Sequence, residues 1–161
     1  MKHERQTGAR SFLDQPEINV LLFALLLNFP WEILQAPLFK GMTEGSHWEA
    51  VKVCTRATFG DAVIMLVAYS IVAAGSRNRL WLRKPRWLEM TAFITAGLVI
   101  TMVIEYLATR TDFWAGTWEY SASMPTLPLL GTGLMPVLQW ILIPPLVAWF
   151  VRRQLNWGNG E

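Results

Sequence analysis

The chain has 161 residues and a formal net charge of +2; 53% of the residues are hydrophobic, nine are tryptophan, and the mean hydropathy is +0.30. This is the size of one domain, but it is too apolar for an ordinary soluble one. The single cysteine, Cys54, excludes an intrachain disulfide. We therefore expect one all-α integral membrane domain over residues 1–161, with no nucleic-acid partner because no binding module accompanies the basic residues.

Four apolar stretches are long enough to cross a hydrocarbon core of about 30 Å as helices. They cover residues 18–39, 58–75, 87–109 and 134–151. The second helix is expected to begin outside the membrane near His47, because helical spacing continues from there to Asp61. Pro30 in the first stretch, and Pro144 with Pro145 in the last, should kink their helices.

The basic residues are distributed unequally between the two ends of these stretches. Most lie before the first, between the second and third, or after the fourth: Lys2, Arg5, Arg10, Arg77, Arg79, Arg83, Lys84, Arg86, Arg152 and Arg153. The positive-inside rule then places both termini in the cytoplasm, here of a bacterial inner membrane. No small-residue cleavage site follows the first apolar run, so a cleaved signal peptide is not expected.

The first stretch carries a polar stripe in an apolar setting. Asn28, Glu32 and Gln35 stand at i, i+4 and i+7 and share one helix face. A carboxyl group in a bilayer costs roughly 2.5 to 3.5 kcal/mol on insertion scales, so it faces the bundle interior, holds a proton or has a partner. The stripe is therefore either a functional site or a set of structural hydrogen bonds that join the helices.

Polar groups of all four helices fall at a similar depth. Glu32 lies two turns from the outer end of its helix, Asp61 near the start of the second and Glu105 near the end of the third, with Gln139 at a similar level in the fourth. Bundles build sites from such layers. We predict that the four side chains meet in the outer half of the membrane.

The connection over residues 110–133 is rich in aromatic residues and proline but poor in charge. It contains Phe113, Trp114, Trp118 and Tyr120. Aromatic side chains favour the membrane interface, and prolines stiffen the backbone. We expect an ordered cap over the polar layer.

Carboxyl groups close together in a low dielectric cannot all ionise, so one should hold a proton and serve as a general acid. We predict Glu32 and Glu105 as the acid and base, with Asp61 tuning them. Aromatic faces could stabilise a carbocation in a lipophilic substrate. The predicted substrate contacts are Asn28, Trp31, Gln35, Trp118, Tyr120 and Gln139.

No cofactor is predicted, although the carboxylates also suit a divalent metal. The set would then be Glu32, Asp61, Glu105 and His47. The paired Glu-x-x-His motifs of ferritin-like di-iron sites are absent from the sequence.

Four motifs carry a resemblance that covers nearly the whole chain. They are Asn-x-Pro-Trp-Glu-x-x-Gln-x-Pro-Leu-Phe (28–39), Gly-Asp (60–61), Trp-x-Tyr-x-x-x-Met-Pro (118–125) and Gly-x-Gly-Leu-x-Pro-x-x-Gln (131–139). The pattern resembles a family of small uncharacterised bacterial four-helix membrane proteins, which implies no activity. A fainter likeness, through Glu105, Trp118-x-Tyr120 and Pro136, is to integral-membrane carotenoid cyclases and hydratases, whose Pro-x-Glu-Glu motif this chain lacks.

Three functions stay open. The first is an acid/base enzyme or binder of a lipophilic, isoprenoid-like ligand, with membrane lipids as further partners. The second is a small proton- or cation-coupled carrier or channel. Against it, Tyr69 and Ser70 are the only polar side chains past Asp61 in the second span, so a pathway of ionisable groups to the cytoplasm is missing. The third is a structural or accessory subunit, and a homo-oligomer fits each of the three.

Overall fold

The computed structural model describes residues 14–109, 118–128 and 131–157. Most of this part of the chain is helical, and it contains no β-strand, only two isolated β-bridges. Four long helices follow one another: α1 (Pro16–Gln35), α2 (His47–Ser76), α3 (Trp87–Ala108) and α4 (Leu134–Trp157). Two short 3-10 helices, η2 (Ala36–Leu38) and η3 (Trp81–Arg83), lie in the connections. The expected all-α class with four helices is confirmed, and α2 begins at His47 as predicted.

All four helices are long and apolar enough to cross a membrane. Their outward faces carry large apolar side chains that the protein itself does not cover. These include Leu26, Leu34, Phe59, Val63, Leu88, Val99, Val103, Leu142 and Leu146. Helices that are apolar all round are typical of a lipid environment, where such exposure has no hydrophobic cost.

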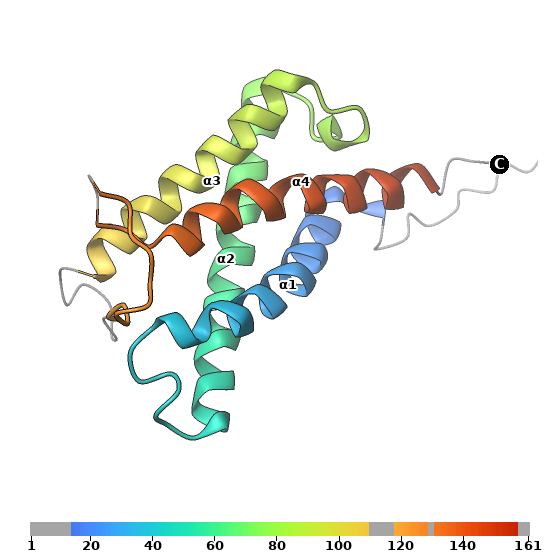
Figure 1. Ribbon diagram of the computed structural model, residues 1–161. Coiled ribbons are helices and arrows are strands. Elements are labelled where there is room, and N and C mark those ends of the chain that lie inside the picture. Colours follow the sequence, from blue (N-terminus) through green and yellow to red (C-terminus); the bar gives the residue numbers. More distant parts are fainter. Residues whose placement is uncertain (1–13, 110–117, 129–130, 158–161) are drawn as a thin grey trace, which may run out of the picture.

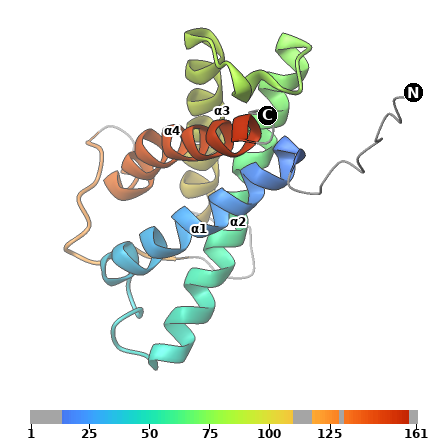
Figure 2. The same cartoon turned by 90° about the vertical axis from the view of Figure 1, so that its right-hand side faces the viewer.

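The helices form a closed ring of neighbours, in which α1 packs on α2 and α4, and α3 packs on the same two helices. Figures 1 and 2 show that α1 and α4 cross α2 obliquely. The start of α1 and the end of α4 lie on the same side of the molecule (Figure 1). Chain direction therefore alternates around the ring.

Local sequence signals fix the helix ends. At the start of α2, the Ser46 hydroxyl accepts a hydrogen bond from the Glu49 backbone N–H at 3.2 Å, which is an N-cap. The same helix ends at Arg77, whose φ of +51° is left-handed and turns the chain. At the start of α3, the Glu89 carboxylate accepts from the Arg86 backbone N–H at 2.8 Å and from its guanidinium at 2.8 Å.

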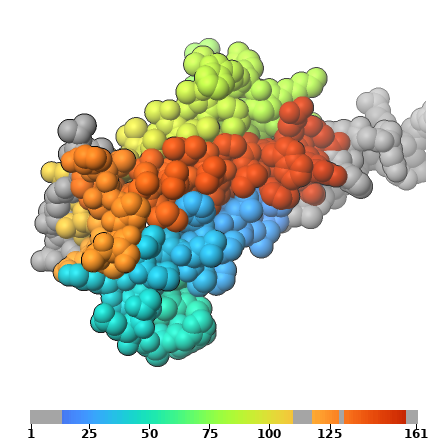
Figure 3. Space-filling model, in the orientation of Figure 1, coloured from blue at the N-terminus to red at the C-terminus, as the bar shows by residue number. Residues whose placement is uncertain are grey.

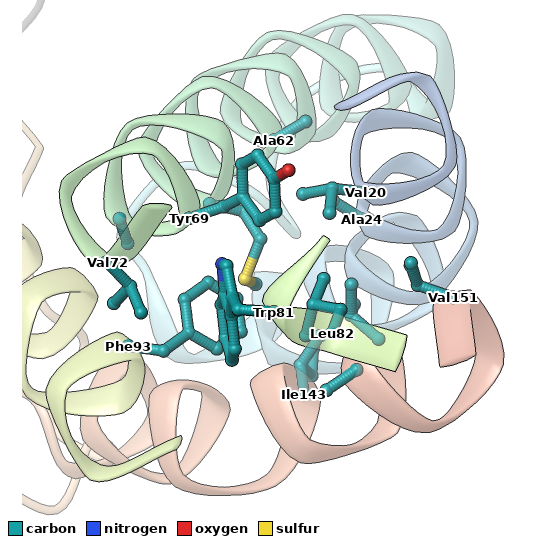
Figure 4. Packing of buried hydrophobic residues seen from close by; sticks show 14 of the residues in the cluster. Val20, Ala24, Ala62, Tyr69, Val72, Trp81, Leu82, Phe93, Ile143 and Val151 are labelled. Atoms are coloured by element: carbon teal, nitrogen blue, oxygen red, sulfur yellow. The ribbon is translucent and has the colours of Figure 1, made fainter. Parts of the chain in front are cut away.

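The core lies where η3 inserts among the helices. Trp81 is fully buried, with its ring centroid 5.9 Å from that of Tyr69 in α2 and 5.5 Å from that of Phe93 in α3. Figure 4 shows this aromatic group beside Val20 of α1 and Ile143 of α4. Burial of such rings is a main stabilising term, so the α2–α3 connection is an integral part of the bundle.

A bidentate ion pair joins the start of α1 to the same connection. Arg79 donates through Nε to Glu17 Oε1 at 2.6 Å and through Nη2 to Oε2 at 2.7 Å. The Tyr69 hydroxyl donates to the Arg79 carbonyl and lies 3.3 Å from Glu17 Oε1. From the sequence, Arg79 counts only as a positive charge on the cytoplasmic side. In the structure it also holds the start of α1 against the α2–α3 connection.

At the other end of the bundle, the α1–α2 connection pairs with the α3–α4 connection through a β-bridge between Phe39 and Tyr120. The Lys40 backbone N–H donates to the Glu119 carbonyl at 2.9 Å, and the Ser121 N–H donates to the Leu38 carbonyl at 2.9 Å. The side chains of Lys40 and Glu119 also form an ion pair. Figure 3 shows the segment from residue 118 lying against the connection that follows α1. The described part of the predicted cap is thus ordered; Phe113 and Trp114 lie outside the described residues.

One glycine sets the distance between α3 and α4. A Cβ atom added to Gly97 would lie 1.9 Å from Cζ3 of Trp140 and 2.3 Å from its Cε3. Trp140 is 1% exposed, so its ring has little room to move. Only glycine allows the indole this close to the α3 backbone, and this contact positions the segment of α4 that carries Gln139.

Candidate functional site

Gln139, which is buried on α4, connects three helices. Its Nε2 donates to Asn28 Oδ1 at 2.8 Å and to Asp61 Oδ2 at 2.7 Å, and it lies 3.4 Å from Glu32 Oε1. Asn28 and Glu32 come from α1 and Asp61 from α2. Three of the four side chains of the predicted polar layer, Glu32, Asp61 and Gln139, therefore meet in a hydrogen-bonded network around one amide group.

The polar stripe of α1 faces this network. Asn28, Glu32 and Gln35 are all buried. Gln35 Nε2 donates to Glu32 Oε1 at 2.7 Å, while Asn28 Nδ2 donates to the Ala24 carbonyl at 2.8 Å. From α2, Cys54 Sγ approaches the backbone carbonyl of Glu32 at 3.5 Å.

The carboxyl groups of Glu32 and Asp61 meet at the Gln139 amide, whose Nε2 lies 3.4 Å from Glu32 Oε1 and 2.7 Å from Asp61 Oδ2. Because a carboxylate only accepts, two carboxyl groups can bond only when one of them carries a proton. Glu32 is 8% exposed, whereas Asp61 is partly exposed. The network is thus buried where α1 contributes to it.

Glu105 heads a second polar group, toward the cap. It is 7% exposed, and its Oε2 accepts from the Trp118 indole N–H at 3.3 Å and from the Tyr120 hydroxyl. Sequence analysis pairs Glu32 with Glu105, but the hydrogen bonds group Glu32 with Asp61. The difference arises because depth along a helix does not fix which way its side chains point.

Several polar atoms near the network are buried without a hydrogen-bond partner among the described residues. They are Gln35 Oε1, Trp31 Nε1, Thr101 Oγ1 and Trp140 Nε1. Gln35 itself is 4% exposed. Gln35 Oε1 is an acceptor, whereas the two indole N–H groups are donors. A buried donor or acceptor without a partner costs roughly 1 to 3 kcal/mol.

The metal set considered from the sequence is not assembled. Among the described residues, no three His, Cys, Asp or Glu side chains are grouped so that they could hold a metal ion. His47 is exposed at the first residue of α2, and Glu105 bonds to the cap.

Compared with known proteins, the chain matches no family model, no curated protein and no solved structure. The resemblances drawn from its motifs stay predictions.

Two contacts were missed from the sequence. The approach of Cys54 to Glu32 could have been found, because Cys54, Thr58 and Asp61 share a face of α2. The pairing of Glu17 with Arg79 has no such signal, since the two residues are 62 positions apart.

Proposed function

We propose that this chain is an integral membrane protein whose Glu32–Asp61 pair forms an acid–base site for a lipophilic, isoprenoid-like ligand, which it converts or binds. The observation that supports this is that two carboxyl groups lie at one buried amide. Gln139 Nε2 is 2.7 Å from Asp61 Oδ2 and 3.4 Å from Glu32 Oε1. Gln35 also donates to Glu32. Two negative charges this close in a low dielectric repel each other, so the pair favours a shared proton.

A proton held between two carboxyl groups is available for transfer. Such a pair can protonate a substrate through one oxygen and accept a proton at the other, which is what isomerisation, hydration or cyclisation of an apolar substrate requires. Trp31 lies beside the stripe on α1, and Glu105 with its cap contacts adds a second acid. The unpartnered oxygen of Gln35 offers an acceptor to a ligand hydroxyl.

We also propose a bacterial inner-membrane location with both termini in the cytoplasm. Cations without an ion pair to a described residue gather at the end where α2 and α4 finish: Arg77, Arg83, Lys84, Arg152 and Arg153. At the opposite end, Lys40 pairs with Glu119 and Lys52 with Glu49, and Arg56 is the one described cation without an ion pair. This asymmetry of free positive charge agrees with the positive-inside rule.

The test compares Glu32→Gln, Asp61→Asn and Glu105→Gln with the parent protein in detergent. Glu44→Gln, an exposed acid between α1 and α2, is the matched control. Thermal unfolding and mass spectrometry of co-purifying lipids are measured on each. We expect the first two variants to stay folded, because each new amide can both donate and accept, and to lose or accumulate a lipophile that the control retains.

If the variants unfold at much lower temperature and their bound lipids are unchanged, the network only joins helices and the proposed function is wrong. If Glu105→Gln alone changes the lipids, the active acid lies under the cap and the Glu32–Asp61 assignment is wrong.

A further inference from the structure

A basic groove of about 270 Å³ lies on the last turns of α4, away from the polar network. It is lined by Trp149, Arg152, Arg153 and Asn156. The Arg153 guanidinium lies over the Trp149 ring, with its Cζ atom 5.6 Å from the ring centroid. Neither arginine forms an ion pair with a described residue. The groove thus concentrates two positive charges that no carboxylate of the described residues pairs with.

An apolar track leads into the groove. Leu142, Leu146 and Trp149 are 49%, 47% and 52% exposed and stand at i, i+4 and i+7, with Arg153 four residues further on. These four side chains share one face of α4. Figure 3 shows the end of α4 at the molecular surface. One helix face therefore presents an apolar stretch that ends in cations.

We propose that this face binds an anionic phospholipid, with its phosphate between Arg152 and Arg153 and its acyl chains along Leu142 and Leu146. Guanidinium groups hold phosphate through paired, charge-assisted hydrogen bonds, and tryptophan settles at the headgroup level of a bilayer. The Asn156 amide can donate to a further headgroup oxygen. A zwitterionic headgroup is disfavoured because its own cation would meet two arginines.

The experiment uses the full chain in nanodiscs that contain phosphatidylglycerol and phosphatidylcholine. Native mass spectrometry measures how much of each lipid stays bound in the parent and in Arg152→Gln/Arg153→Gln. A basic residue near an anionic surface contributes about fivefold to binding, so the double variant should retain phosphatidylglycerol roughly thirtyfold more weakly. Arg153→Gln alone should give about fivefold, which keeps the test valid if the double variant folds poorly.

The matched control is Arg77→Gln/Lys84→Gln, which removes the same charge from exposed positions outside the groove. The control should keep the parent preference. Equal losses in both double variants would show a general surface-charge effect and overturn the proposal. Displacement of phosphatidylglycerol by millimolar inorganic phosphate would identify a soluble-anion site and overturn it as well.

Discussion

The close approach of Trp140 to Gly97 makes Gly97→Ala a direct test of the packing of α3 on α4. The added methyl would lie 1.9, 2.3 and 2.7 Å from three carbons of the indole ring. Carbon atoms pack at about 3.5 to 4.0 Å, so the ring or the helix must move by roughly 1.5 Å. Overpacking of this kind costs about 1 to 3 kcal/mol or more.

Alanine also favours a helix by about 1 kcal/mol relative to glycine. Because the added methyl would clash so closely, we take the upper end of the overpacking range, about 3 kcal/mol. A net loss near 2 kcal/mol then remains, which would lower the melting temperature by about 4 to 8 °C. Gly75→Ala in α2 is the control, because nothing lies within 4 Å of its added Cβ. That variant should melt at or above the parent temperature.

Unfolding can be followed with a fluorogenic maleimide, because Cys54 is the only cysteine and is 2% exposed. Gly97→Ala combined with Trp140→Leu should lose less stability than the two single changes added together, since the smaller side chain relieves the clash. If Gly97→Ala has the same melting temperature as Gly75→Ala, α3 and α4 do not approach each other as closely as described, and the reasoning is refuted.

Three further predictions concern the polar groups. Gln139→Leu should lower the free energy of unfolding by roughly 2 to 4 kcal/mol, because Asp61 loses its short donor; an unchanged denaturation midpoint would contradict this. Lys40 lowers the pKa of Glu119 below its ordinary 4.5, so the ion pair is present above that range and lost as pH falls through the lowered value. Lys40→Met should raise the Glu119 midpoint in a carbon-13 NMR titration, and identical midpoints would exclude the pair. Cys54 should react with maleimide at least tenfold more slowly in folded protein than in denatured protein; equal rates would mean that α1 and α2 are not packed there.

The four helices could be predicted because each contains a long apolar run. Ser46 before His47 marks the start of α2, and the apolar spacing carries it inward. The inward orientation of the α1 stripe also followed from the cost of exposing an acid to lipid.

The pairing within the site could not be predicted. Helical spacing places Glu32, Asp61 and Glu105 at one depth but leaves open how each helix rotates about its axis. That rotation is fixed by packing, including the close contact of Gly97 with Trp140. It turns Glu105 toward the cap and leaves Asp61 beside Glu32.

The closure of the network by Gln139 also orders events during synthesis. Gln139 is made 78 residues after Asp61 and 111 after Asn28. At about 5 to 20 residues per second, the nascent hairpin of α1 and α2 waits roughly 4 to 16 s after Asp61 for its shared amide donor. A chain that stops before α4 would leave Asp61 without the Gln139 amide, so α1 and α2 alone should form a less stable unit than the complete bundle.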